Sequence, residues 1–320
     1  MDQASLGLIY CEVMALYHSG LDSLEPQDMH FSDFSDWLLH TSDHRSELQK
    51  KQHEFWTETL KDVQPTYLSS STPSEEPLSD LTEIEAAMDA TTLALCQSLM
   101  KEIGATPSEG FFAVYNTLLY HDSSQETMVV GTTFTQRNTA QLANVVGPLT
   151  TLIPIKTTVD PNQTFKEYFT GFRADLSKSL ENGDIAYEDI NSEIPDSSRC
   201  PRSFRHSFSY DGMHLDAISG LEMKGMEVKN FRTLSKSEDK NQELLLDVYG
   251  KTGRIILRFN NHIFSEEKAR KFLDTYITFV EALCTSPDSK MCDLSVFNPT
   301  VAAPVTSLET ASLLAVTTTT

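Results

Sequence analysis

The spacing of apolar residues along the chain predicts alternating helices and strands. Apolar side chains recur every three or four residues, as in amphipathic helices, over residues 5–18, 44–61, 90–103, 107–120, 164–181 and 266–284. Runs of β-branched or alternating apolar residues predict strands at 81–86, 127–135, 149–159, 203–210, 243–249 and 254–260. This order of elements is typical of an α/β protein with a sizeable mixed sheet.

Three further segments follow neither pattern. Residues 21–40 combine loop residues with large aromatic ones, and the pattern assigns them to neither a helix nor a strand. Residues 62–80 are rich in Ser, Thr, Pro and acidic residues, which predicts an exposed linker. Residues 300–320 end in four threonines and are expected to form a disordered tail.

The net charge narrows the classes of partner. The 320 residues include 25 Lys and Arg against 46 Asp and Glu, a formal charge of −21. Such a chain repels phosphate backbones and anionic lipids, so we expect neither nucleic acid nor a membrane as a partner. No apolar run approaches the roughly 18 residues of a transmembrane helix. Five cysteines without a CxxC pair and a start without a basic signal region favour a reduced compartment, so we expect a cytoplasmic protein.

Several common catalytic and binding motifs do not occur in the sequence. It contains no GxGxxG or GxxxxGK[ST] phosphate loop and no GxSxG nucleophile elbow. His40 and His44 are spaced like metal ligands on one helix face, but no third ligand is obvious. We therefore interpret them as solvated side chains and assign no metal site.

An ordered set of segments resembles the core motifs of nonribosomal peptide synthetase condensation domains. The segments, with the family pattern in parentheses, are 31–37 (YxDYAxW), 55–60 (YWxxxL), 130–137 (VGTPxxxR), 145–156 (IGxFVNTLPLR), 181–189 (HQDxPFE), 196–201 (RDxSRNP) and 259–264 (the late YxxxxF segment). Each match is weak alone, but all seven follow the family's order over residues 1–297. The chain is identified as a member of this family, similar to its fungal representatives.

The resemblance implies the α/β fold that condensation domains share with chloramphenicol acetyltransferase, a mixed sheet with helices on one face. Residues 1–61 would be a remnant of the N-terminal lobe with its crossover helices, 62–80 the linker and 81–299 the C-terminal condensation lobe. With an incomplete N-terminal lobe, the helix at 5–18 would leave its apolar face unburied. That face predicts self-association of the isolated chain.

The resemblance also implies a function, the formation of amide or ester bonds between carrier-bound acyl groups in nonribosomal peptide or polyketide–peptide hybrid biosynthesis. In the family, the second histidine of an HHxxxDG motif orients or deprotonates the acceptor amine as it attacks a thioester. Here Asp2-Gln3 occupies the DG position, so both histidines would precede Met1, which is either an internal residue of the motif or the start of a truncated lobe. Without them, the chain alone is expected to be a poor catalyst.

Two other functions remain open at this point. The chain could be a non-catalytic module that docks a carrier protein or a partner synthase. A different acyl transfer on the same fold would need an HxxxD histidine, and no such motif is suitably placed. In either case the resemblance implies that the domain itself binds no cofactor and that its substrates are carried on the phosphopantetheine of carrier proteins.

The resemblance indicates which residues form the site. In the family, the motif Asp pairs with the Arg of VGTPxxxR, which predicts an ion pair between Asp2 and Arg137. The alternative is a frayed chain start beside a solvated arginine. His206, on the strand at 203–210, is a candidate substitute for the missing histidine, although a lone strand histidine is more often a core or surface residue.

Four further residues are expected on the substrate side of the tunnel that condensation domains form. They fall in the segments that resemble IGxFVNTLPLR and HQDxPFE, and they are Gly147, Thr150, Thr151 and Asp184. The two threonines replace the usual FVN-type residues, so the resemblance does not identify the substrate.

Overall fold

The computed structural model describes most of the chain. The described residues are 2–24, 26–40, 42–64, 66–69, 81–137, 139–185, 190, 205–210, 222–223, 226–227 and 242–297, without the side chains of 3, 21, 38–46, 222–223 and 226–227. The predicted tail at 300–320, the segment at 196–201 and the side chains of His40 and His44 lie outside this description.

Most of the longer elements lie close to the positions predicted from the sequence, whereas α2, α6, β5 and β6 were not predicted. The helices are α1 (Gln3–Ser19), α2 (Phe31–His40), α3 (Ser42–Leu60), α4 (Ala90–Glu102), α5 (Pro107–Ser123), α6 (Ala140–Ala143), α7 (Phe165–Glu181) and α9 (Glu266–Thr285). The strands are β1 (Leu81–Ala87), β2 (Thr127–Thr135), β3 (Thr150–Thr158), β4 (His206–Tyr210), β5 (Glu222–Met223), β6 (Met226–Glu227), β7 (Leu244–Val248) and β8 (Arg254–Asn260). Short 3₁₀ turns lie at Leu21–Ser23, Met291–Asp293 and Ser295–Phe297.

Six strands form one mixed sheet in the order β1-β8-β7-β4-β2-β3. β4 runs parallel to both β2 and β7, whereas the other neighbouring strands are antiparallel. β1 forms one edge and pairs with β8, with Leu81 opposite Asn260. The mixed α/β sheet predicted from the sequence is therefore confirmed.

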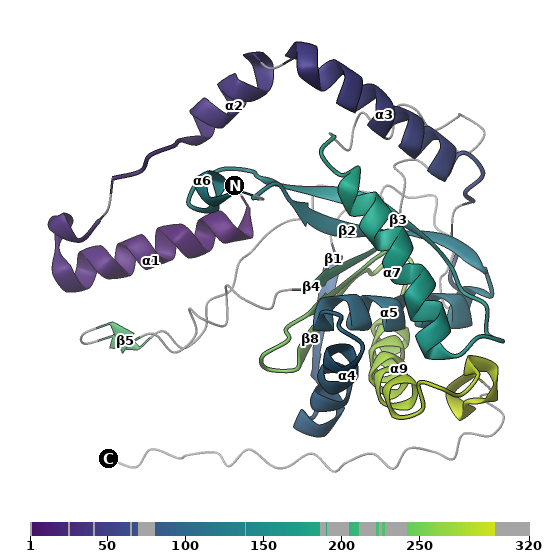
Figure 1. The fold of residues 1–320 in the computed structure, drawn as a ribbon. Coiled ribbons are helices and arrows are strands. Elements are labelled where there is room, and N and C mark those ends of the chain that lie inside the picture. Colours follow the sequence, from purple (N-terminus) through teal and green to yellow (C-terminus); the bar gives the residue numbers. More distant parts are fainter. Residues whose placement is uncertain are drawn as a thin grey trace, which may run out of the picture.

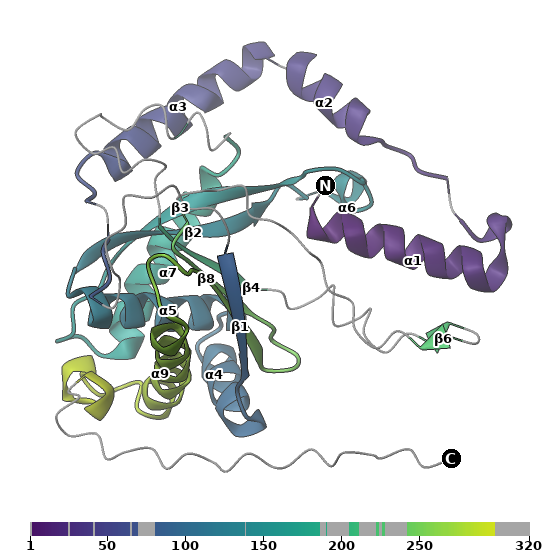
Figure 2. The same ribbon diagram turned by 180° about the vertical axis from the view of Figure 1, so that it is seen from behind.

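Helices α4, α5, α7 and α9 form a layer on one face of the sheet (Figures 1 and 2). Phe208 of β4 stacks on Phe112 of α5 with ring centroids 4.8 Å apart. Tyr276 of α9 donates a hydrogen bond to the carbonyl oxygen of Phe111 at 3.0 Å. The buried apolar side chains between helices and sheet form the main core, which places the helices on one face as the resemblance implied.

The opposite face of the sheet carries ion pairs between neighbouring strands. Among the described residues these pairs are Arg205–Glu243, Arg258–Asp247, Arg258–Glu83 and Arg254–Glu85. Successive side chains of a strand point to opposite faces, so the same strands supply apolar groups to the core and charged groups to the other side.

Helices α1, α2 and α3 form an arch beside this sheet-and-helix body (Figure 1). Among the described residues of α1, only Ser5, Gly7 and Met14 are buried. Val13 is 45% exposed and Tyr17 is 47% exposed. The apolar face predicted for this helix is present, and much of it is exposed in this structure.

The segment at 21–40 contains a helix that its sequence pattern did not indicate. Asp33 accepts a hydrogen bond from the backbone N–H of His30 at 2.7 Å, which fixes the first turn of α2. Phe34 is buried in a small cluster with Leu142 and Leu149. Tertiary packing of this one aromatic residue stabilises a helix whose own apolar pattern is short.

The predicted exposed linker at 62–80 lies partly outside the described residues, and its described part is not uniformly exposed. Thr66 and Leu68 are buried. The carbonyl oxygen of Thr66 lies 3.2 Å from Nε2 of His206, and Arg205 lies over the ring of Tyr67. The polar composition predicts solvent exposure, but Leu68 packs in the main core and the Thr66 carbonyl oxygen contacts β4.

Candidate functional site

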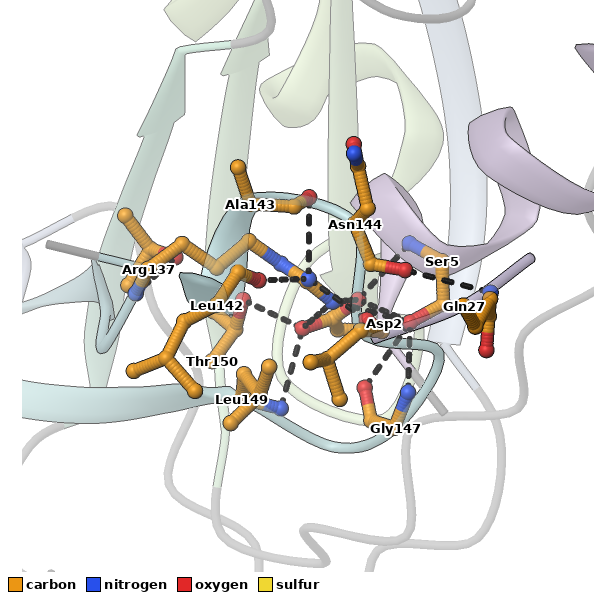
Figure 3. A network of polar contacts seen from close by, with 12 residues as sticks. Asp2, Ser5, Gln27, Arg137, Leu142, Ala143, Asn144, Gly147, Leu149 and Thr150 are labelled. Carbon is orange, nitrogen blue, oxygen red and sulfur yellow. Dashed lines mark hydrogen bonds and ion pairs between the residues drawn. The ribbon is translucent and has the colours of Figure 1, made fainter. Parts of the chain in front are cut away.

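Asp2 and Arg137 form a buried ion pair at the junction of the arch and the sheet (Figure 3). Asp2 precedes α1, and Arg137 follows the end of β2. Nη2 of Arg137 lies 2.9 Å from Oδ1 and 3.1 Å from Oδ2 of Asp2. Only 8% of the arginine side chain and 6% of the aspartate side chain is exposed. The ion pair implied by the resemblance is present, and it joins the start of α1 to the sheet.

The Arg137 guanidinium also contacts the end of the short helix α6. Nη1 donates hydrogen bonds to the carbonyl oxygens of Leu142 at 3.0 Å, Ala143 at 3.4 Å and Val145 at 2.6 Å. Carbonyl groups at a helix C-terminus lack partners within the helix and carry partial negative charge. They therefore stabilise the cation on the side away from Asp2.

Ser5 lies fully buried at the centre of the same network. Its hydroxyl accepts hydrogen bonds from the backbone N–H of Gly147 and from Nη2 of Arg137, each at 2.9 Å. The same hydroxyl has two acceptors within reach, Oδ1 of Asp2 at 2.7 Å and the carbonyl oxygen of Gly147 at 2.9 Å. Asp2 also caps α1, because its side chain accepts the Ser5 N–H at 2.9 Å.

The turn between α6 and β3 completes the network around Asp2. Oδ2 of Asp2 accepts hydrogen bonds from the backbone N–H of Leu149 at 3.0 Å and from the hydroxyl of Thr150 at 3.2 Å. Gly147 lies against Phe31 of α2, where an added Cβ would be 2.3 Å from Cδ2 of the ring. Three of the segments that resemble family motifs, those with Phe31, Arg137 and Gly147, therefore meet beside Asp2.

The surroundings of Asp2 keep its carboxyl group ionised. Burial by itself raises the pKa of a carboxyl group, but hydrogen bonds from Ser5 and Arg137 and the positive charge of Arg137 outweigh it. The pKa of Asp2 consequently lies below its ordinary value. A carboxylate held in this way is a weak proton acceptor at neutral pH, so its contribution is to position the start of α1.

Thr151 and Asp184 lie outside this network. Thr151 is paired with Phe134 in the β2–β3 ladder, and its side chain points to the face opposite Thr150. Asp184 follows α7 and accepts a hydrogen bond from Nε2 of Gln136 at 3.4 Å. Gln136, which directly precedes Arg137, has no signal in the sequence beyond its place in the segment 130–137.

His206 is not brought to the network. Its ring is fully buried, and burial lowers its pKa to about 4, so it is neutral at physiological pH. The next residue, Ser207, pairs with Gly131 in the middle of β2. Arg137 lies six residues beyond Gly131, which corresponds to roughly 20 Å along the strand direction. The structure thus favours a core histidine.

Within the described ranges, no helix is long and apolar enough to cross a membrane. The same ranges contain no group of three His, Cys, Asp or Glu side chains that could hold a metal ion.

Comparison with known proteins explains why these motifs converge. The family model of the condensation domain matches residues 1–303. The chain belongs to the condensation-domain family. It is 24% identical over 305 residues to surfactin synthase subunit 1 of Bacillus subtilis (strain 168), an alignment that covers 93% of this chain and 8% of that protein. The family resemblance inferred from the ordered motifs is confirmed.

Solved structures show the same fold. The first condensation domain of the calcium-dependent antibiotic (CDA) synthetase superposes with a TM-score of 0.73 at 14% identity, over 92% of this chain and 64% of that one. The X-domain in its complex with OxyB from teicoplanin biosynthesis superposes with a TM-score of 0.75 at 18% identity, over 92% and 67%. This condensation-domain chain therefore spans about two thirds of each solved chain.

Proposed function

We propose that this condensation-domain chain takes part in forming an amide or ester bond between two acyl groups carried on phosphopantetheine, in nonribosomal peptide or polyketide–peptide hybrid synthesis. The observation that carries the proposal is the buried network in which Asp2 contacts Arg137, Ser5 and the turn at Gly147. The match to the condensation-domain family and the similarity to surfactin synthase subunit 1 support the proposal. The network supports it by holding Asp2, the matching remnant of the catalytic motif, in one fixed position.

The proposed reaction needs a base that the network does not supply. In amide formation the acceptor amine attacks the thioester carbonyl carbon, a C–N bond forms, the C–S bond breaks, and the amine proton passes to a base. Asp2 is a weak proton acceptor because its pKa is lowered, and Arg137 is a cation. We propose that the second histidine of the family's HHxxxDG motif supplies this base, either from a longer reading frame or from a partner chain.

The test reads what the transcript encodes before Met1 and then assays condensation. A longer polypeptide with an upstream HHxx segment is incubated with a loaded donor carrier and a loaded acceptor carrier, and the carrier-bound product is measured by mass spectrometry. We expect product from the longer chain and none from residues 1–320 alone. Arg137→Ala in the longer chain should abolish product, whereas Arg270→Ala, which removes an exposed pair with Glu266, should not. If residues 1–320 alone formed as much product as the longer chain, the proposal that a histidine outside residues 1–320 supplies the base would be contradicted.

A second function, docking of a partner protein, is favoured by the exposed apolar face of α1. Val13 and Tyr17 are each almost half exposed, and contiguous exposed apolar surface marks interaction sites. We propose that this face also drives self-association of the isolated chain. Sedimentation velocity of residues 1–320 should show oligomers, and Val13→Glu with Tyr17→Glu should shift them to monomer. Unchanged oligomers in that double variant would assign the association to another surface.

A further inference from the structure

Two cysteine side chains meet inside the helix layer that covers the sheet. Cys96 lies on α4 and Cys284 lies in the last turn of α9, and these two helices pack against each other (Figures 1 and 2). The thiols are close enough for a hydrogen bond between them. Both are free thiols in this structure. Two residues from distant parts of the sequence therefore bring their sulfur atoms together at the α4–α9 interface.

The pair lies in a dry, apolar environment. Cys96 is fully buried and Cys284 is 7% exposed, and both belong to the main core. The hydrogen bond with Cys284, together with burial, raises the pKa of Cys96 well above its ordinary value, so this thiol keeps its proton at neutral pH. An apolar core disfavours a thiolate because it is charged, whereas a disulfide is neutral. The surroundings thus suit the oxidised product of the pair better than the thiolate form.

The two cysteines differ in the space around them. An added Cβ at Gly110 of α5 would lie only 3.1 Å from Sγ of Cys96 and 2.6 Å from Sδ of Met100, so Cys96 is enclosed between α4, α5 and α9. Cys284 is one residue from the end of α9, and a last turn opens more readily than the middle of a helix. A small reagent therefore reaches Cys284 first, when this turn opens, and finds no room beside Cys96.

We propose that Cys96 and Cys284 form a thiol–disulfide exchange site whose co-reactant is a low-molecular-weight disulfide and whose oxidised form fastens the end of α9 to α4. This inference is independent of the condensation function proposed above. Only two facing thiols are required, and no charged residue or metal ion takes part.

The reaction has two exchange steps. Cys284, as its thiolate, attacks one sulfur of the small disulfide, so a mixed disulfide forms on Cys284 and one small thiolate leaves and takes up a proton. When the turn closes again, Cys96 loses its proton and attacks Sγ of Cys284. The Cys96–Cys284 bond forms, the mixed disulfide breaks, and a second small thiol leaves. The protein has then given up two protons and two electrons, and the small disulfide has been reduced to two thiols.

The test exposes the folded, reduced chain of residues 1–320 to glutathione buffers that range from fully reduced to fully oxidised. The samples are quenched with acid, their remaining thiols are alkylated, and the digested peptides are identified by mass spectrometry. We expect a cross-linked pair of peptides that contain Cys96 and Cys284, in a fraction that rises as the buffer becomes more oxidising.

Three variants separate the steps of the exchange. In Cys96→Ala the second step cannot occur, so the mixed disulfide of Cys284 with glutathione should accumulate at least about tenfold above the wild type. In Cys284→Ala, Cys96 should stay unmodified because it is enclosed. Cys11→Ala is the control, since Cys11 is exposed on α1, and it should leave the Cys96–Cys284 cross-link unchanged.

Hydrogen exchange measures the consequence for α9. In the oxidised wild type, the amides of the last turn of α9 should exchange at least about tenfold more slowly than in the reduced protein, because the cross-link opposes local opening. Cys96→Ala treated with the same buffers should show no such slowing. The absence of a Cys96–Cys284 cross-link in the folded chain, a cross-link that forms only in urea, or an adduct on Cys96 instead of Cys284 would overturn the proposal. Equal exchange of α9 in the oxidised and reduced wild type would overturn it as well.

Discussion

The contacts that stabilise the body of sheet and helices differ from those that attach the arch of α1–α3 to it. In the body, apolar side chains of six strands and four covering helices pack into one continuous core. In the arch, the C-terminal end of α3 packs into this same core through Trp56 and Leu60, whereas α1 and α2 contact the body at the Asp2 network and the small Phe34 cluster. Most of the side chains of α1 are left partly or fully exposed.

This difference means that the two regions respond to different kinds of change. A core built from many apolar contacts loses stability in proportion to the volume removed. An attachment made of a few buried polar groups fails when one partner is lost, because the other then remains buried without compensation. α1 should therefore be able to open locally while the body and the end of α3 stay folded.

The largest loss of stability is expected when a buried side chain of the body is removed. Phe208→Ala removes a buried ring that stacks on Phe112 and should lower the free energy of unfolding of the body by about 4 kcal/mol. Urea unfolding followed by circular dichroism measures it. Leu180→Ala, at a partly exposed position on α7, is the control and should cost less than about 1 kcal/mol. Similar losses in both variants would mean that the core is not continuous around Phe208.

Loss of the Asp2–Arg137 ion pair should make α1 open more easily and leave the stability of the body unchanged. Arg137→Ala leaves the Asp2 carboxylate buried without its cation and should lower the free energy of opening of α1 by about 3 kcal/mol. Hydrogen exchange of the α1 amides measures this opening, and the exchange of β7 and β8 should stay unchanged. Arg270→Ala, from an exposed pair, should change neither. If β7 and β8 lost protection together with α1, the arch and the body would form one cooperative unit.

Acid should lower the free energy of unfolding of the body because His206 is buried in its neutral form. Because burial lowers the pKa of this histidine to about 4, the unfolded chain binds its proton more readily than the folded chain as the pH falls below about 6.5. The stabilisation that neutral His206 provides is fully present above about pH 6.5 and is lost as the pH falls toward 4. Between pH 7.5 and pH 5 the loss should be about 2 kcal/mol.

The variant His206→Phe isolates this contribution from the other acidic and basic groups. The difference in free energy of unfolding between wild type and variant, measured in urea at both pH values, should shift by about 2 kcal/mol in favour of the variant at pH 5. A constant difference across the two pH values would show that the histidine titrates normally in the folded protein.

The smallest effect is expected at Ser5. Ser5→Ala removes one hydroxyl from the network and leaves Gly147 and Arg137 each short of one hydrogen bond, so α1 opening should become easier by about 1–2 kcal/mol. Ser177→Ala, whose hydroxyl makes an exposed contact with Glu181, is the control and should leave exchange of α1 unchanged. If the α1 amides exchanged at the same rate in Ser5→Ala as in the wild type, Ser5 would not contribute to the stability of the network.

The body was predictable from the sequence because its patterns are long. Periodic apolar spacing located α4, α5, α7 and α9 within a few residues, and runs of β-branched or alternating apolar residues located β7 and β8. α2 and the burial of Leu68 were not predictable in this way. Each depends on one or two side chains that meet distant parts of the chain, which no local pattern records.

The site was predictable only through ordered motifs. The Asp2–Arg137 pair follows from the family pattern, since 135 residues separate the two and no periodicity connects them. Ser5 and Gln136 were missed because a serine near a helix start and a glutamine after a strand are common. His206 was singled out by residue type, and only the register of β4 with β2 shows how far it lies from Arg137.

The pairing of β1 with β8 has a consequence for synthesis on the ribosome. Leu81 and its partner Asn260 are 179 residues apart in the chain. At about 5–20 residues per second, β1 leaves the ribosome roughly 10–35 s before its partner strand. During that interval the edge of the sheet cannot close, and the last helix, α9, is the element that packs over the completed β1–β8 edge. Translation pauses before residue 260 should therefore prolong the exposure of β1 to chaperones.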